Sequence, residues 1–195
     1  MQEIRLALVG AGHRGRHMFQ TGVNAAEKII PAAACDINPD LWYKSQNGQK
    51  AMAEIYPDTA FYEDFQTMLN NEKIDVLLVE TPAHIHSSFC AEGLNRNINV
   101  LSDIPLVRST EEADMLWEAG KKSKATLMTG ANPNEWGFIE ALYDLFQQGL
   151  LGRPFYLEAE YIHDVRYLWK ETPWRSKGMP IRYCTHSLGP LLRLL

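Results

Sequence analysis

A glycine-rich segment near the N-terminus has the residue types that hold a phosphate group. Gly10, Gly12 and Gly15 directly follow an apolar run and open a helical stretch, which is the setting of a dinucleotide-binding turn. The first glycine permits a tight turn, the second lets the backbone approach a pyrophosphate, and the third lets helix and strand pack closely. The helix N-terminus adds unpaired N–H groups and a positive dipole. His13 and Arg14 lie inside this loop, where we expect them to contact the same ligand.

An acidic residue further along the chain indicates which dinucleotide would bind. Asp36 ends the second apolar run, 21 residues beyond Gly15. A carboxylate at this spacing accepts hydrogen bonds from the ribose of NAD and repels the 2′-phosphate of NADP. The sequence therefore predicts NAD as the cofactor. The alternative is a Rossmann-like domain that binds another nucleotide-type ligand, or none.

Phenol and imidazole side chains gather in the last third of the chain. Tyr161 and His163 are two residues apart and share a face if the segment is extended. Tyr183 and His186 are three apart and share a face if their segment is helical. Such groups can hydrogen-bond a sugar hydroxyl and accept its proton. The alternative is that they make structural polar contacts.

The histidine and cysteine spacing indicates neither a metal site nor a disulfide framework. His84 and His86 lie two apart after an apolar run, but no matching Cys, Asp or Glu constellation accompanies them. The three cysteines, Cys35, Cys90 and Cys184, are an odd number and lie far apart, which suits a reducing compartment. We expect no bound metal.

The composition is typical of a soluble globular protein. The 195 residues carry a formal net charge of −5, and 46% of them are hydrophobic. No block of Lys and Arg residues is present, which disfavours nucleic acid as a partner. No stretch approaches the roughly 20 apolar residues of a membrane-spanning helix, and the first apolar run is too short for a signal peptide. We expect a cytoplasmic protein without membrane contact.

Apolar runs alternate with helical segments along the first 130 residues, which is typical of a parallel sheet wrapped by helices. The run Val76–Val79 lacks polar alternation, as expected of a central strand buried on both faces. Ser109 to Glu112 reads as a capping box that opens a helix. The expected strands are Ile4–Val9, Ile29–Cys35, Ile74–Glu80, Ile98–Ser102 and Thr126–Gly130.

Four segments resemble the Gfo/Idh/MocA oxidoreductases. In the family's order they are LALVGAGHRG, VETPAHIHSSFCAEGLNRNINVLSDIP, STEEADMLWEAGKKSKATLMTG and FQQGLLGRPFYLEAEY. The resemblance implies an α/β fold: a doubly wound, NAD-binding Rossmann domain over residues 1–130, then part of a substrate and oligomerisation domain with an open sheet over residues 131–195. A helix over Glu135–Gln148 would lead into that domain, and the alternating segment Phe155–Ile162 would be one of its strands.

The same resemblance assigns further residues to the cofactor groove. It implies that Thr81, Pro82 and His86 line the groove. Asp103 stands at the glutamate of the family's Glu-Lys-Pro motif, and we expect it to contact the cofactor. The lysine of that motif, which commonly serves as acid/base or substrate anchor, is replaced by Ile104, which cannot exchange a proton. This replacement weakens an ordinary sugar-dehydrogenase assignment.

A narrower resemblance points to the NAD-dependent α-N-acetylgalactosaminidases, a glycosidase branch that also lacks this lysine. It is carried by Tyr161–Arg166, Trp174-Arg175 and Tyr183–Pro190. It implies a catalytic group with His186 as base, and substrate contacts from Trp174 and Arg175. The other expected catalytic residues are Tyr161, His163 and Tyr183.

Three functions follow as hypotheses. The first is an NAD-dependent oxidoreductase that transfers a hydride from a carbohydrate or polyol. The second is a glycoside hydrolase in which transient oxidation at carbon 3 acidifies the proton at carbon 2, so that the group at carbon 1 is eliminated and water adds. The third is a nucleotide-binding protein without catalysis.

The length suggests a truncated second domain. The sheet domain needs about 130 residues, which leaves too few for an open sheet of several strands, and the chain ends on the apolar stretch Leu191–Leu195. We expect an intact cofactor domain with the first wall of a substrate site. A homo-oligomer is expected only where the complete second domain is present.

Overall fold

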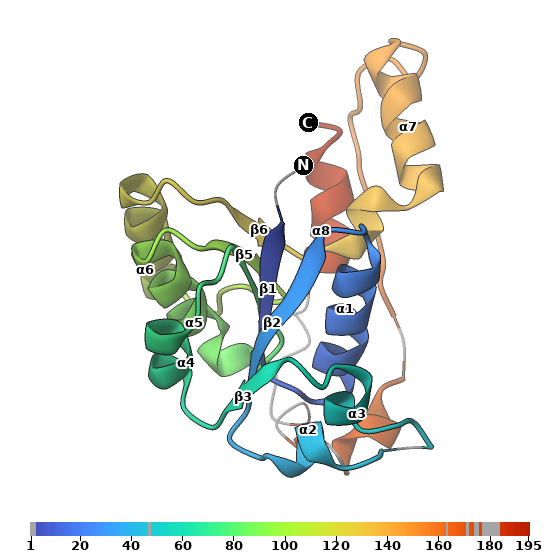
Figure 1. Cartoon of the computed structure of the whole chain (residues 1–195). Coiled ribbons are helices and arrows are strands. Elements are labelled where there is room, and N and C mark those ends of the chain that lie inside the picture. Colours follow the sequence, from blue (N-terminus) through green and yellow to red (C-terminus); the bar gives the residue numbers. More distant parts are fainter. Residues whose placement is uncertain (1–2, 47, 163, 171, 174–175, 177–183) are drawn as a thin grey trace. The chain divides into compact units, whose positions relative to one another are not determined.

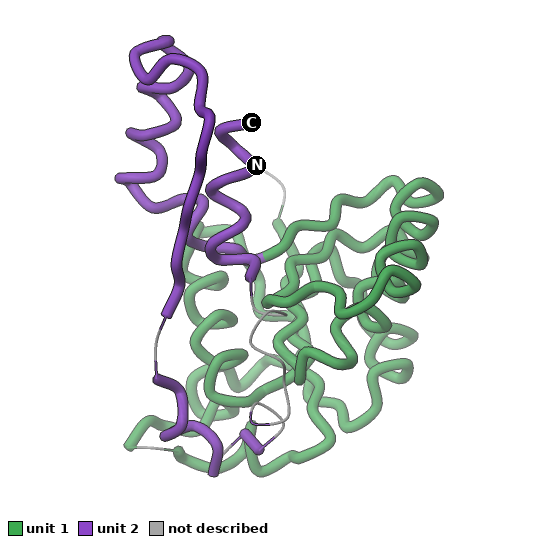
Figure 2. Tube along the Cα trace, turned by 180° about the vertical axis from the view of Figure 1, so that it is seen from behind, with its two compact units in different colours: residues 1–129 green, residues 130–195 purple. Residues whose placement is uncertain are grey.

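The chain folds into two compact units, Met1–Thr129 and Gly130–Leu195, which Figure 2 distinguishes by colour. The computed structural model describes residues 3–46, 48–162, 164–170, 172–173, 176 and 184–195. All strands of the described residues lie in the first unit.

The first unit is built on a six-stranded parallel sheet (Figure 1). The strand order is β3-β2-β1-β4-β5-β6, which is the doubly wound order of a Rossmann fold and reverses between β1 and β4. The predicted Rossmann sheet is therefore confirmed. The strands are β1 (Ile4–Val9), β2 (Ile29–Cys35), β3 (Ala60–Tyr62), β4 (Val76–Val79), β5 (Asn99–Ser102) and β6 (Leu127–Thr129).

The sequence predicts five of these strands and misses β3. This strand has only three residues and pairs only with β2, through Ala33 with Ala60 and Cys35 with Tyr62 at its ends. It lies at the edge of the sheet, where all its residues are half-buried. An apolar run this short carries no period that separates a strand from a turn.

Helices cover both faces of the sheet, with α1 on one face and α4, α5 and α6 on the other (Figure 1). Ala7 and Val9 pack in one buried cluster and Leu6 and Leu8 in the other, because successive side chains of a strand point to opposite faces. The helical elements of this unit are α1 (His13–Asn24), α2 (Asp40–Tyr43), α3 (Met52–Ile55), α4 (Phe65–Asn71), the 3₁₀ turn η1 (Ala83–Ile85), α5 (His86–Asn95) and α6 (Thr110–Lys122).

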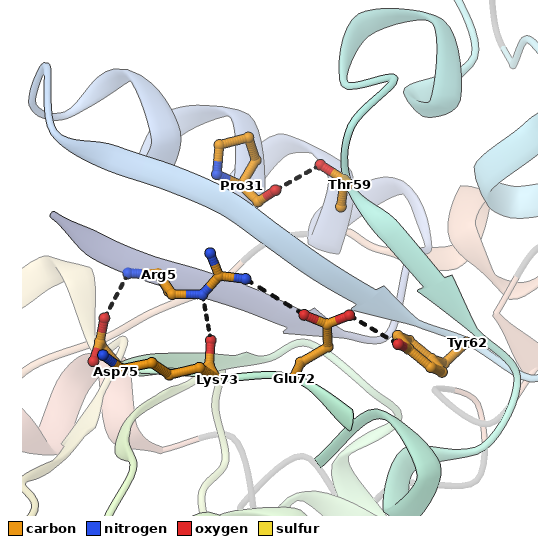
Figure 3. A network of polar contacts seen from close by, with 7 residues as sticks. All are labelled: Arg5, Pro31, Thr59, Tyr62, Glu72, Lys73 and Asp75. Carbon is orange, nitrogen blue, oxygen red and sulfur yellow. Dashed lines mark hydrogen bonds and ion pairs between the residues drawn. The ribbon is translucent and has the colours of Figure 1, made fainter. Parts of the chain in front are cut away.

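A polar network joins β1 to the connection between α4 and β4 (Figure 3). The Nε of Arg5 donates to the carbonyl of Lys73 at 2.7 Å, and its backbone N–H donates to Asp75 at 2.8 Å. Glu72 accepts from the hydroxyl of Tyr62 at 2.8 Å and forms an ion pair with Arg5. The bond to Glu72 raises the pKa of Tyr62. These contacts tie β1 and β3 to the chain entering β4, and we assign them a structural role.

The second unit contains helices and extended segments. Its helical elements are η2 (Asn132–Glu135), α7 (Gly137–Gln147), η3 (Arg166–Trp169) and α8 (Thr185–Leu192). The helix expected over Glu135–Gln148 is thus present as α7, which begins two residues later because Trp136 has an extended backbone and separates it from η2. Arg193, which follows α8, donates to the carbonyl of Asn134 and pairs with Glu140. These bonds fasten the end of the unit to its beginning.

The strand expected over Phe155–Ile162 does not form. The segment has no assigned strand, and the side chains at its two ends are exposed, Phe155 fully and Ile162 to 84%. A strand needs a partner for its N–H and C=O groups, and no segment of the described residues pairs with this one. The alternating pattern correctly indicated an extended segment, but it carries no information on whether a second strand pairs with that segment.

None of the described helices has the length and apolar character needed to cross a membrane.

Truncating a core side chain of β4 tests the packing of the sheet. Leu78 is 3% exposed and lies in the cluster on the α1 face. We expect Leu78→Ala to lower the free energy of unfolding by about 2–5 kcal/mol, because it leaves a cavity. Urea denaturation followed by circular dichroism measures the loss. Met128→Ala, at a β6 side chain that is 59% exposed, should change it by less than about 0.5 kcal/mol. Equal effects of the two variants would contradict this packing.

Candidate functional site

The glycine-rich loop joins β1 to α1 by a turn whose first position, Gly10, admits only glycine. Gly10 has φ +95°, and a Cβ there would lie 2.6 Å from the backbone of Glu80. A Cβ on Gly15 would lie 1.8 Å from the carbonyl oxygen of Gly10. By contrast, a Cβ on Gly12 would meet nothing within 4 Å. The first and third glycines therefore serve packing, whereas the second borders open space, as a phosphate-binding loop requires.

The N-terminus of α1 is open to an anion. The helix begins at His13 after Gly12, and no side chain caps it. The N–H groups of its first turn are directed toward this end of the helix, where the dipole is positive. The side chains of His13 and Arg14 are exposed beside them. These residues fit a bound pyrophosphate.

Asp36 braces the same loop. It follows β2, and its carboxylate accepts hydrogen bonds from the N–H of Ala11 at 2.8 Å and the N–H of Asn38 at 2.9 Å. Each carboxylate oxygen keeps a second lone pair that can accept from a ribose hydroxyl. Asp36 thus lies against the phosphate loop, in agreement with the spacing argument. Its hydrogen bond to the backbone of Ala11 was not foreseen.

The residues after β4 lie at the same edge of the sheet as the phosphate loop, where the parallel strands end. Thr81 and Pro82 are half-buried. His86 is only 1% exposed, with Nδ1 2.9 Å from the carbonyl oxygen of Pro105 and Nε2 2.6 Å from that of Thr81. Its ring therefore joins the loop after β4 to the loop after β5 and lies behind the surface that a ligand would touch. The structure supports His86 as a positioning residue.

The structure brings together three charged residues that the sequence analysis did not connect. The guanidinium of Arg14 lies 3.8 Å from a carboxylate oxygen of Glu80 and 3.8 Å from one of Asp103. The Glu80 side chain is 1% exposed, and its Oε2 has no hydrogen-bond partner. Burial, and then the charge of Asp103, raise the pKa of Glu80 to about 8, which Arg14 only partly opposes. The sequence contains one feature that could have indicated a functional role for Glu80: it is a charged residue at the end of an apolar run.

In the second unit, Tyr161 and His186 come together. Their ring centroids are 4.4 Å apart at 52°, although the residues are far apart in sequence. Both line a pocket of about 260 Å³ between η2, α7 and α8, just below the usual size range of small-molecule sites. His186 is 7% exposed. The structure thus unites two of the four predicted catalytic residues.

The remaining predicted residues of this group fall outside the described part of the chain. These residues are His163, Trp174, Arg175 and Tyr183. Within the described part, no three His, Cys, Asp or Glu side chains lie close enough together to hold a metal ion. His84 is exposed in η1.

Comparison with known proteins finds relatives for both units. A sequence model of an oxidoreductase family with an NAD-binding Rossmann fold, Gfo/Idh/MocA, matches residues 4–131. An alpha-N-acetylgalactosaminidase of Shewanella oneidensis is 24% identical over 204 residues, covering 98% of this chain and 44% of that protein. The chain therefore spans less than half the length of this curated relative.

Solved structures show the same fold. A putative dehydrogenase from Bordetella bronchiseptica superposes with a TM-score of 0.80 at 21% identity, over 99% of this chain and 50% of that chain. The WlbA dehydrogenase from Bordetella pertussis, solved with NADH and UDP-GlcNAcA, gives a TM-score of 0.69 at 20% identity, over 78% of this chain and 42% of that one.

The burial of Glu80 predicts a pH-dependent stability. Its pKa is raised from the usual 4.5 to about 8, so the folded state favours the neutral acid, and stability is lost as pH rises from 4.5 to 8. At about 1.4 kcal/mol for each pKa unit, the loss is about 4–5 kcal/mol. We expect Glu80→Gln, which cannot ionise, to melt several degrees above the wild type at pH 8.5 and to lose this advantage at pH 4.5. Thermal melts across this range measure the gap. A gap that does not change with pH would contradict the buried acid.

Proposed function

Because the chain belongs to the Gfo/Idh/MocA oxidoreductase family with its NAD-binding Rossmann fold, we propose that it provides the cofactor domain of an enzyme that oxidises a carbohydrate or polyol. The open space at Gly12, between the uncapped N-terminus of α1 and the Asp36 carboxylate, carries the proposal. The helix N-terminus can bind a pyrophosphate and the neighbouring carboxylate can bind a ribose, in the order in which these groups follow each other in a dinucleotide.

The residues that would hold NAD surround this space. Gly12 and the first turn of α1 would bind the pyrophosphate, Asp36 the ribose, and the loops joined by His86 would border the remaining part of the cofactor. NAD, when bound, supplies the hydride transfer. The chain's own task is to orient the two partners and to move protons.

His186 and Tyr161 are the groups we propose for the proton. Their ring centroids lie 4.4 Å apart, with the rings tilted at 52°, in one pocket, so that the imidazole can accept a hydroxyl proton while the phenol hydrogen-bonds the same oxygen. Ile104, which is 4% exposed, offers no exchangeable proton in its place. We propose the same substrate side for His163, Trp174, Arg175 and Tyr183.

A redox-type glycosidase is the second candidate. It is favoured by the alpha-N-acetylgalactosaminidase relative, which matches 98% of this chain, and by the residue Ile104. In such an enzyme, oxidation of the sugar at carbon 3 makes the proton at carbon 2 acidic. A base such as His186 would remove that proton, the bond at carbon 1 would break by elimination, and water would add in its place. NAD would accept the hydride from carbon 3 at the start and supply it again at the end, so that no net oxidation remains.

We further propose a cytoplasmic location, since Cys35, Cys90 and Cys184 are all free thiols. A homo-oligomer formed through the second domain remains a proposal as well.

The preference for NAD is tested at Asp36. In Asp36→Asn, the negative charge that repels a 2′-phosphate is removed, while the amide oxygen can still accept from the N–H of Ala11. We expect the ratio of the NADPH to the NADH dissociation constant to fall about tenfold, which corresponds to about 1.4 kcal/mol. Fluorescence titration measures both constants. Asp40→Asn, on α2 at an exposed carboxylate paired with Lys44, is the matched control. The assignment fails if the ratio is unchanged at Asp36 or falls equally at Asp40.

The reaction is tested with nitrophenyl glycosides and free sugars in the presence of NAD. Stoichiometric NADH without release of nitrophenol supports the dehydrogenase, whereas release without net NADH supports the glycosidase. Binding of NAD with neither reaction supports a nucleotide-binding protein. His186→Ala should lower either rate at least about 100-fold, as expected for loss of a general base. A rate that is retained in this variant excludes His186 as the base.

A further inference from the structure

Glu80 lies where the end of β4 meets the phosphate loop. A Cβ on Gly10 would lie 2.6 Å from its backbone, and a Cβ on Gly15 would lie 3.2 Å from its Cβ. The carboxyl group is therefore held against the turn that receives the pyrophosphate. Its Oε2 is buried and has no hydrogen-bond partner, which is costly for an ionised carboxylate.

The charges around Glu80 do not balance when it is ionised. Arg14 from α1 and Asp103 from the loop after β5 are the charged groups that act on it. One guanidinium then faces two carboxylates, both at 3.8 Å. With Glu80 neutral, Arg14 and Asp103 balance each other. A pyrophosphate brings two more negative charges to the same edge, so it would be repelled by the ionised cluster.

We propose that the pyrophosphate of NAD(H) binds only when Glu80 is protonated, so that cofactor binding above neutral pH takes up one proton at this carboxyl group. The carboxylate gains the proton from solvent and becomes the neutral acid. Glu80 is a positioning residue in this scheme, because its protonation state decides the net charge beneath the loop. When Glu80 is neutral, Arg14 can interact with Asp103 and with the ligand. The proposal rests on the NAD site and is independent of which substrate is oxidised.

The direction of the pKa shift agrees with this geometry. Burial and Asp103 raise the pKa of Glu80 to about 8, and a bound pyrophosphate would raise it further. The protonated fraction of the free protein thus falls above pH 8. The thiols of Cys35 and Cys90, whose pKa values burial raises to about 12 and about 11, stay protonated at pH 9 and do not contribute.

The test is a pH series of NADH binding to the 195-residue chain. The dissociation constant, measured by fluorescence, should rise about tenfold between pH 7 and pH 9 in the wild type. Calorimetry at pH 9 in two buffers of different ionisation enthalpy should give uptake of nearly one proton per NADH. In Glu80→Gln, the dissociation constant should be independent of pH and the proton count should be zero. Glu118→Gln, at an exposed carboxylate on α6, should behave as the wild type.

Two further arms separate this coupling from other causes. ADP-ribose, which has the pyrophosphate without nicotinamide, should show the same pH dependence as NADH. Asp103→Asn leaves the burial of Glu80 in place but removes the negative charge that raises its pKa further, so the midpoint of the transition should move to lower pH. A wild-type proton count near zero at pH 9 overturns the proposal without any variant. It is also overturned if ADP-ribose binding is independent of pH, or if Glu80→Gln keeps the wild-type profile.

Discussion

Hydrogen bonds that continue the parallel ladder one residue past each strand hold the ligand edge of the first unit together. In each case the backbone N–H that follows a strand donates to the last carbonyl of the neighbouring strand, at 2.9–3.1 Å. This occurs at four residues, which follow β1, β2, β4 and β5: Gly10, Asp36, Glu80 and Asp103. The bonds fix where each loop leaves the sheet, so that residues up to 93 positions apart meet at one edge. The contacts that Asp36, Glu80 and Asp103 make around the phosphate loop depend on this arrangement, because it places the three residues at the same edge of the sheet.

The glycines follow from the same constraint. Once β1 and β4 are neighbours, the turn after β1 passes so close to Glu80 that no Cβ fits on Gly10, and α1 starts so close to this turn that none fits on Gly15. The spacing of these residues is a local property of the sequence, which is why the loop, β1, α1 and the position of Asp36 could all be predicted from it. The central strand β4 could be predicted for a similar reason, since burial on both faces leaves a continuous apolar run.

The parts that sequence reasoning missed depend on contacts between distant segments. His86 joins carbonyls on two different loops, and its type alone does not distinguish such a brace from a residue that contacts a ligand. The edge strand β3 exists only because β2 offers it a partner. Phe155–Ile162 has the pattern of a strand but no partner in the described residues. Tyr161 and His186 could be singled out by type, whereas their contact required the packing of η2, α7 and α8.

Two acidic residues at this edge, Asp36 and Glu80, have similar side chains but different surroundings, and the surroundings give them different roles. Asp36 accepts two backbone N–H bonds, and its remaining lone pairs can accept from a ligand hydroxyl. Glu80 has no such donor at its buried oxygen and faces a second carboxylate, Asp103, an arrangement that favours the neutral acid. A dinucleotide needs both kinds of partner, since its ribose hydroxyls donate protons whereas its pyrophosphate repels negative charge. The half-buried, hydrogen-bonded carboxyl group of Asp36 and the buried carboxyl group of Glu80, with Arg14 beside Glu80, meet both needs at one edge of the sheet.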